Sequence, residues 1–370
     1  MAIYLQDFQI DCFRGIRNLN IRGLNHINLI VGDNNCGKTS VLESLLLLRN
    51  PGDLANVLRI ARQRETTFFY GRTPMYDNFI NLFPHDKQGS EIRISALFKH
   101  EPVEYFLHGE QKQILLDEIE LSRQKLLFVN RQRNRDMPGN TETTAFVGAM
   151  DYRIGNKQHR KPVSLHEFSH ISGMEINKDN MIDMLYLSPI DHMRGNILNN
   201  IVRNDDYKAI CLRVIQIFDS DIIDLLILNN EQTNRPVEYI KHRVLGNMPI
   251  STYGDGIKKV LFLANAIAQT AGGVLLIDEV ETAIHSKYYD DIFRFLVKTC
   301  MQFGVQVFIT THNLEAVDAL LATQDYGEQA VQDEISIITL KKSSERTYSR
   351  ILPGRKVQEN RESFDFEVRL

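Results

Sequence analysis

Short apolar runs separated by polar breaks predict an α/β protein. The clearest run is residues 27–31, INLIV, whose nearly continuous apolar character is typical of a strand buried on both faces. A glycine-rich turn follows it, and residues 38–48 then place apolar side chains at helical spacing. Further strands are predicted at 3–10, 19–22, 92–98, 103–107, 113–121, 184–187, 222–228, 237–244, 274–277, 305–310, 335–340 and 348–352, and further helices at 54–64, 197–202, 207–218 and within 249–267.

Residues 122–183 show neither period clearly and are rich in basic and polar side chains. One interpretation is an exposed arm that contacts nucleic-acid phosphates or a partner protein, because basic side chains supply sequence-independent affinity. The other, which we favour, is a solvated surface loop. The basic side chains are Arg131, Arg133, Arg135, Arg153, Lys157, His159, Arg160 and Lys161.

The turn at residues 32–39 has the spacing of a phosphate-binding loop. It reads GDNNCGKT and satisfies G-x-x-x-x-G-K-[ST] between a strand and a helix. Its glycines let successive N–H groups point at a phosphate, and the helix start adds a positive end. Lys38 is expected to neutralise β- and γ-phosphate oxygens, and the Thr39 hydroxyl to bind Mg²⁺. The nucleotide-binding residues predicted here are Gly32, Asn34, Asn35, Cys36, Gly37, Lys38, Thr39 and Ser40.

The predicted strand at 274–277 ends in a pair of carboxylates. Val274–Ile277 is a continuous apolar run, and Asp278 and Glu279 follow it directly. Such a run is typical of a buried parallel strand with functional groups at its carboxyl end. Asp278 is expected to complete the metal shell, and Glu279 to orient and deprotonate an attacking water.

Two further segments complete a recognisable order. Residues 249–267, PISTYGDGIKKVLFLANAI, join a Ser/Gly-rich turn to an apolar helix, and the strand at 305–310 ends in Thr311-His312-Asn313. Phosphate loop, signature-like turn, Asp-Glu strand and histidine strand together resemble the ABC-type ATPase heads of SMC, RecF and OLD proteins. That resemblance implies a P-loop ATPase head with a mixed central sheet, an antiparallel β subdomain and an inserted helical or loop region.

The resemblance also implies roles for single residues. Ser251, Gly254 and Gly256 would cover the γ-phosphate held by a second, head-to-tail protomer, and His312 would contact that phosphate or the attacking water. A Phe-Arg pair commonly sits near the nucleotide in such heads, so Arg14 would lie at the adenine or the α-phosphate. A packed turn is an equal alternative for Arg14. Where the family has a glutamine after the strand at 184–187, this chain has Ser188 and Pro189.

The expected organisation is one ABC-type domain, 1–370, in two lobes. Residues 1–121 carry the phosphate loop, residues 184–370 carry the signature, Asp-Glu and histidine elements, and 122–183 form a variable insertion. The chain has 43% hydrophobic and 24% charged residues, no apolar run suited to a membrane helix, and no signal-peptide pattern at its start. Its four cysteines lack metal or disulfide spacing. We therefore expect a cytoplasmic protein without a membrane partner.

The motifs predict an enzyme that hydrolyses Mg·ATP between two subunits, with ATP and Mg²⁺ as cofactors. By analogy with the family, the expected role is a sensor or regulator subunit of an anti-phage system whose effector, a nuclease, is a separate chain. Two alternatives stay open. One is a RecF-like repair ATPase that grips DNA, which the net charge of −4 permits through a local basic groove. The other is a scaffold in which ATP stabilises an oligomer without turnover.

Overall fold

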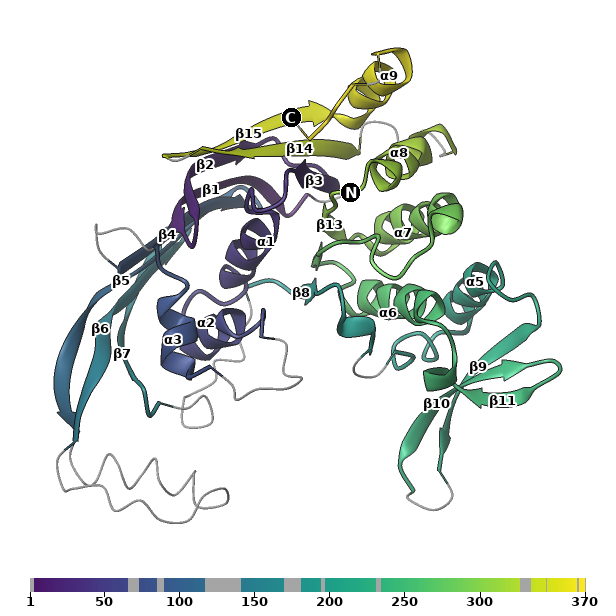
Figure 1. Cartoon of the computed structure of the whole chain (residues 1–370), viewed down its shortest axis with the longest axis horizontal. Coiled ribbons are helices and arrows are strands. Elements are labelled where there is room, and N and C mark those ends of the chain that lie inside the picture. Colours follow the sequence, from purple (N-terminus) through teal and green to yellow (C-terminus); the bar gives the residue numbers. More distant parts are fainter. Residues whose placement is uncertain are drawn as a thin grey trace.

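Two six-stranded β-sheets face each other, and helix α1 (Lys38–Leu47) packs between them (Figure 1). The computed structural model describes residues 3–65, 73–84, 90–116, 141–169, 181–193, 197–230, 234–326, 334–343, 345–364 and 366–369. Within these residues, no helix is both long and apolar enough to cross a membrane.

The first sheet is wholly antiparallel, in the order β2-β1-β4-β5-β6-β7. Its alternating burial pattern fits a sheet with one face on a core and one face in solvent. The strands are β1 (Leu5–Phe13), β2 (Ile16–Arg22), β4 (Ser90–Phe98), β5 (Glu101–Leu116), β6 (Thr141–Ile154) and β7 (Lys157–His166).

Residues 141–166, within the stretch 122–183 that showed no clear period, form two strands of this first sheet. Strands β6 and β7 form a hairpin, and β6 pairs with β5 along its length. The basic residues from Arg153 to Lys161 therefore lie on strands and their turn, and not on an arm or a loop. Arg131, Arg133 and Arg135 lie outside the described residues. The two strands predicted at 103–107 and 113–121 are one continuous strand, β5.

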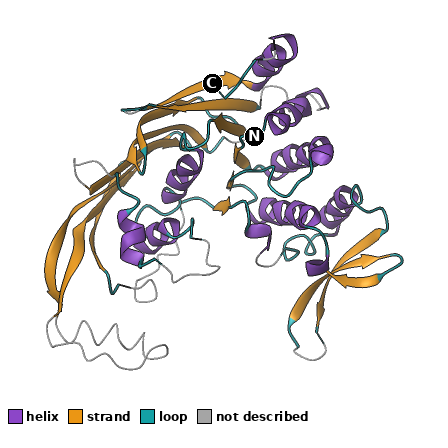
Figure 2. Ribbon diagram, viewed as in Figure 1, coloured by secondary structure: helices purple, strands orange, loops and turns teal. Residues whose placement is uncertain are grey.

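Two short helices cover the concave side of the first sheet next to α1 (Figure 2). Helix α2 (Leu54–Ala61) begins where the Asp53 side chain accepts the N–H of Ala55, a standard N-cap. Helix α3 (Met75–Ile80) follows. Their buried side chains join those of α1 and the sheet in one apolar core, in which Phe79, Phe83 and Phe146 pack ring against ring.

The second sheet carries the predicted motifs at one edge. Its order is β15-β14-β3-β13-β12-β8, and the strands from β14 to β8 run parallel. The carboxyl ends of β3, β12, β13 and β8 therefore meet, as in other open parallel sheets that bind ligands at that edge. The strands are β3 (Ile27–Gly32), β8 (Met184–Leu187), β12 (Val274–Ile277), β13 (Gln306–Thr310), β14 (Ile335–Lys342) and β15 (Thr347–Pro353).

Helices cover the other face of this sheet and enclose a second core. They are α5 (Asp205–Ile215), α6 (Asp255–Gln269), α7 (Tyr289–Phe303) and α8 (Leu314–Ala322), with α9 (Gly354–Phe364) beside α8. A small sheet of β9 (Ile222–Asn229), β10 (Pro236–His242) and β11 (Gly246–Pro249) projects from this lobe. The helix predicted at 197–202 is wrong, since these residues form turns.

Candidate nucleotide site

The phosphate loop has the backbone geometry that its glycines predict. Gly37 caps helix α1 with φ of 106°, and Gly32 has φ of 145°. A Cβ on Gly32 would lie 2.4 Å from the carbonyl oxygen of Leu340 on the neighbouring strand, so only glycine fits. The Lys38 ammonium donates to the carbonyl oxygens of Gly32 at 2.8 Å and Asp33 at 2.9 Å. The Lys38 side chain is thus folded back across the loop in which a phosphate is expected to bind.

The other loop residues differ in exposure. Asn34 and Asn35 are exposed, and Asn35 adopts a left-handed φ of 66°, which asparagine tolerates. Cys36 is buried, and burial raises the pKa of its thiol. The Ser40 hydroxyl accepts a hydrogen bond from the Arg64 guanidinium at 2.9 Å. The exposed amides are therefore at the tip of the loop and the buried side chains at its base.

Asp278 is the centre of a hydroxyl cluster. Its carboxylate accepts hydrogen bonds from the Thr39 hydroxyl at 2.9 Å, the Tyr186 phenol at 3.0 Å and the Thr310 hydroxyl at 2.5 Å. These residues come from the phosphate loop and from strands β8 and β13. Burial, with Asp278 beside it, raises the pKa of Tyr186, which keeps the phenol protonated as a donor. The cluster offers hard oxygen atoms, the ligands that Mg²⁺ prefers.

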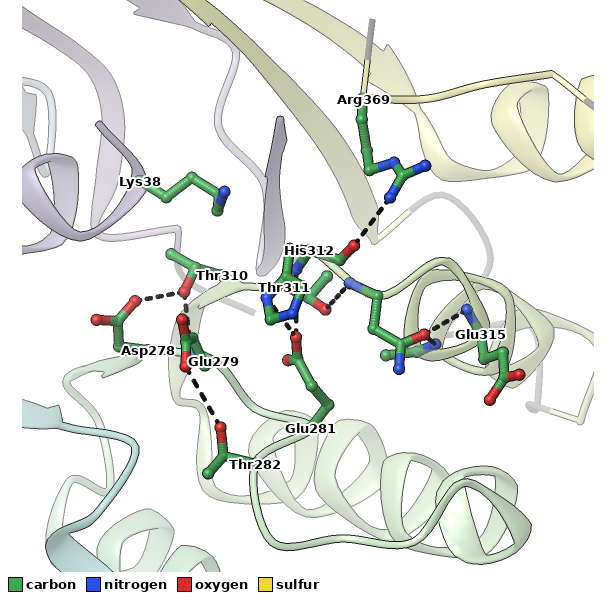
Figure 3. Close-up of polar contacts among 12 residues, drawn as sticks. Lys38, Asp278, Glu279, Glu281, Thr282, Thr310, Thr311, His312, Glu315 and Arg369 are labelled. Atoms are coloured by element: carbon green, nitrogen blue, oxygen red, sulfur yellow. Dashed lines mark hydrogen bonds and ion pairs between the residues drawn. The ribbon is translucent and has the colours of Figure 1, made fainter. Parts of the chain in front are cut away.

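Glu279 is held in a strained backbone conformation next to this cluster (Figure 3). Its φ is 46°, a left-handed value that costs a non-glycine residue about 1–3 kcal/mol. Its N–H donates to the Thr310 hydroxyl at 2.9 Å, and its carboxylate lies 3.5 Å from the Thr282 hydroxyl. The strain and the hydrogen bonds together fix the direction of the Glu279 side chain.

His312 lies one strand over, at the end of β13, with its side chain half exposed. The same carboxylate oxygen of Glu281, Oε1, is 3.2 Å from both the backbone nitrogen and the ring Nδ1 of His312. Arg369 donates to the carbonyl oxygen of His312 at 3.3 Å, as Figure 3 shows. Glu281 therefore sets both the backbone and the ring of the histidine.

Arg14 is engaged in an ion-pair cluster on helix α1. Its guanidinium lies 2.9 Å from the fully buried carboxylate of Glu43, and Arg64 donates to both oxygens of that carboxylate at 2.7 and 2.6 Å. Burial lowers the pKa of Arg14, and Glu43 opposes this. The contact fits the packed-turn alternative for Arg14. A contact between Arg14 and a nucleotide stays a prediction.

The signature-like residues lie at the exposed start of helix α6. Ser251 and Gly254 are exposed, and a Cβ on Gly254 would meet nothing within 4 Å. Gly256 is tighter, with the carbonyl oxygen of Ala283 3.3 Å from its Cβ position. Gly254 caps the helix without a side-chain hydrogen bond, so the amides of the first turn keep their donor capacity. This helix start can therefore approach an external anion.

Comparison with known proteins identifies a family that covers most of the chain. The family model described as "AAA domain, putative AbiEii toxin, Type IV TA system" matches residues 27–318, most of the chain. The chain belongs to this family. The matched residues run from the strand before the phosphate loop to helix α8, so they include every motif at the carboxyl edge of the second sheet.

Individual relatives are more distant. An "ATP/GTP phosphatase" of Helicobacter pylori is 23% identical over 88% of this chain and 90% of its own length. An uncharacterized protein of Methanocaldococcus jannaschii is 31% identical over 31% of this chain and 98% of its own length. A crystal structure of an SMC head bound to the C-terminal winged-helix domain of ScpA superposes with a TM-score of 0.51 and 13% identity, covering 96% of this chain and 100% of that one. The fold of an ABC-type head, expected from the motifs, is confirmed.

Sequence reasoning missed several side chains that complete the site. Tyr186 and Thr310 lie inside predicted strands, and no motif singles them out, although both precede the carboxyl end of a parallel strand. Arg64 ends a predicted helix, and no motif singles it out. Lys259 lies among apolar positions of α6, and a lysine on the buried face of an amphipathic helix is the one sequence signal that could have identified it.

Proposed function

We propose that the protein binds Mg·ATP at the carboxyl edge of the second sheet and hydrolyses it between two head-to-tail copies of the chain. One observation carries the proposal: the Thr39 hydroxyl and the Asp278 carboxylate lie 2.9 Å apart although they are 239 positions apart in the sequence. These are the two groups that ABC-type sites use for the metal. An Mg²⁺ ion held by these two groups would neutralise charge on the phosphate oxygens of ATP.

The chain's own residues supply positioning and charge. Lys38 would exchange its two carbonyl partners for phosphate oxygens, which it can do without leaving a buried cation because it is partly exposed. Glu279, fixed by Thr310, would accept a proton from the attacking water. His312, fixed by Glu281, would donate a hydrogen bond to the γ-phosphate or the water.

The second copy is needed for the signature-like turn. Its exposed helix start at Gly254 presents free amides, and a helix start of this kind attracts anions. In the proposed dimer, this turn and Ser251 would cover the γ-phosphate bound by the partner protomer. The oligomer is therefore at least a pair bridged by ATP.

The biological role that we propose is regulation of a separate effector, a nuclease, in an anti-phage system. The family description names a toxin of a type IV toxin–antitoxin system, which supports a function in a system of more than one component. A RecF-like repair ATPase that binds DNA and a scaffold that holds ATP without turnover are the alternatives that the experiment separates.

The test measures phosphate release and mass in solution with Mg·ATP, with and without duplex DNA, for the wild type, Glu279→Gln and Glu315→Gln. Glu315 is an exposed carboxylate in the first turn of α8, so its variant controls for the same chemical change. We expect turnover in the wild type and the control, none in Glu279→Gln, and a larger assembly of Glu279→Gln held by ATP.

Each other outcome has a meaning. Strong stimulation by DNA would replace the regulator role with the repair role. Retained ATP with negligible turnover in the wild type would favour the scaffold. If the wild type neither hydrolyses ATP nor changes mass, the proposed site is wrong.

A further inference from the structure

Helix α6 buries a lysine behind the catalytic edge. Lys259 is 1% exposed and lies three residues after Gly256. Its ammonium is 3.5 Å from the carbonyl oxygen of Pro189, which is the long limit of a hydrogen bond. Burial lowers the pKa of Lys259 to about 8, and the surrounding carboxylates oppose this. The carboxylates are those of Asp191, Glu281, Asp278 and Glu279.

One of these carboxylates is incompletely satisfied. Glu281 is 8% exposed, and its Oε1 contacts His312, but its Oε2 is buried without a hydrogen-bond partner in the described part of the chain. A buried charged oxygen without a partner costs more than a lost neutral hydrogen bond. A buried ammonium with a long hydrogen bond and a buried carboxylate oxygen without one thus occur at the same site.

The positions of the two groups connect separate parts of the proposed machinery. Lys259 is on the helix whose start is the signature-like turn, and Glu281 is on the loop that follows Glu279. Pro189, which Lys259 contacts, is the second residue after strand β8, at the place where related heads have a glutamine. Helix α6 approaches the Glu281 loop at Gly256, whose Cβ position lies 3.3 Å from the carbonyl oxygen of Ala283, so a shift of α6 against this loop would move Lys259 relative to Glu281.

We propose that Lys259 is a positioning residue that bonds Glu281 Oε2 when α6 docks on the nucleotide of the partner protomer. Through Glu281, the pairing fixes His312 for hydrolysis. The inference rests on the proposed function, because it requires turnover at this site. It adds a link from the signature helix to the histidine that neither motif contains.

The test is a double-mutant cycle of Lys259→Met and Glu281→Gln with ATP affinity and steady-state turnover as readouts. Methionine keeps the length of the buried stem without the charge. Glutamine keeps an oxygen for His312 and puts an amide donor in place of Oε2. We expect each variant to lower kcat about tenfold with ATP affinity changed by less than about threefold, and the double variant to be no slower than either single one.

Lys298→Met is the matched control, because Lys298 is an exposed lysine on the neighbouring helix α7. We expect its kcat and melting temperature to equal those of the wild type. Lys259→Met should melt no lower than the wild type, since it removes a buried charge.

Three results would overturn the inference while the wild type still hydrolyses ATP. The first is an unchanged kcat in Lys259→Met. The second is a double variant whose loss of kcat equals the product of the losses in the two single variants. The third is a loss of both ATP affinity and melting temperature in Lys259→Met, which would make the role of Lys259 structural. Should Lys259→Met fail to fold, an unchanged kcat in Glu281→Gln would still refute it. A wild type without turnover would instead contradict the proposed function.

Discussion

Replacing Thr310 with valine should uncouple the two carboxylates of the site. Thr310 is fully buried, its hydroxyl donates to Asp278 at 2.5 Å, and it accepts the N–H of Glu279 at 2.9 Å. Valine has the same shape, but its side chain can neither donate the hydrogen bond to Asp278 nor accept the one from Glu279. The bond to the charged carboxylate is worth about 1.5–3 kcal/mol, and an orphaned buried N–H costs about 1–3 kcal/mol. The expected loss is about 3 kcal/mol of the free energy of unfolding.

The same change should slow hydrolysis more than it weakens ATP binding. Glu279 keeps its φ of 46° only while its surroundings hold it, and Thr310 is one of its restraints. A displacement of the general base by about 1 Å lowers the rate about a hundredfold, so we expect kcat to fall by about that factor.

Thr311→Val is the control for this prediction. Thr311 is also fully buried, and its hydroxyl accepts the N–H of Asn313 at 3.1 Å, but it does not contact Asp278. Urea unfolding followed by far-ultraviolet circular dichroism suits a chain without tryptophan. Equal losses of stability and of kcat in the two valine variants would refute the reasoning, because Thr310 would then have no special coupling role.

Three further outcomes follow from the geometry. Gly32→Ala should abolish ATP binding and destabilise the fold by more than about 3 kcal/mol, because its Cβ would overlap a strand carbonyl. Gly23→Ala is the control, since Gly23 has a φ of 76° but open space around it, and it should cost about 1 kcal/mol. Calorimetry measures ATP binding, and urea unfolding measures the stability of the two variants. Arg64→Met should lower the free energy of unfolding less than the double variant Arg64→Met/Glu43→Ala does. The opposite order would mean that removing the shared carboxylate relieves the charge left unpaired by the first change, and a double-mutant cycle in urea reports this coupling. The pKa of Lys259 is about 8, below its ordinary 10.5, so the unfolded chain binds more protons than the folded chain between these two pH values. The destabilising contribution of Lys259 is therefore complete below about pH 8 and disappears as the pH rises toward 10.5. The wild type should gain about 3 kcal/mol of unfolding free energy over this range, and Lys259→Met should lack this gain.

The elements that the sequence predicts best are those whose local pattern has one interpretation. Strand β12 is an unbroken apolar run that ends in two carboxylates, and it begins and ends where the pattern places it. The phosphate loop has a spacing that few other structures share. In both cases the signal lies within about ten residues, so no tertiary contact is needed to read it.

The hairpin of β6 and β7 could not be read in this way. The exposed part of β7 carries Lys157, His159 and Arg160, and its strand character comes from pairing with β6, which in turn pairs with β5. The turns at 197–202 show the opposite error, since Ile197 and Ile201 give a helical spacing to residues that pack without forming a helix. Local pattern decides poorly where strand pairing or tertiary packing, and not an apolar period, sets the conformation.

The links within the site were the least accessible to the sequence. The contact of Tyr186 with Asp278 depends on β8 and β12 being neighbours in the sheet, which no motif states. Likewise, the pairing of Arg14 and Arg64 on one carboxylate follows from the packing of α1 against both of their segments. Motifs identify the groups that react, and the fold alone identifies the groups that hold them.

Strand β3 pairs with β13 on one side and with β14 on the other, and both neighbours come more than 270 residues later in the chain. The first sheet, in contrast, is complete by His166. At about 5–20 residues per second, a ribosome that has made β3 needs roughly a quarter of a minute to a minute before either neighbour exists. During that interval the apolar residues 27–31 have no sheet to join, and α1 can pack only against the first sheet. Newly made chains should therefore depend on chaperones most strongly before residue 306 emerges, and truncations in this interval should aggregate.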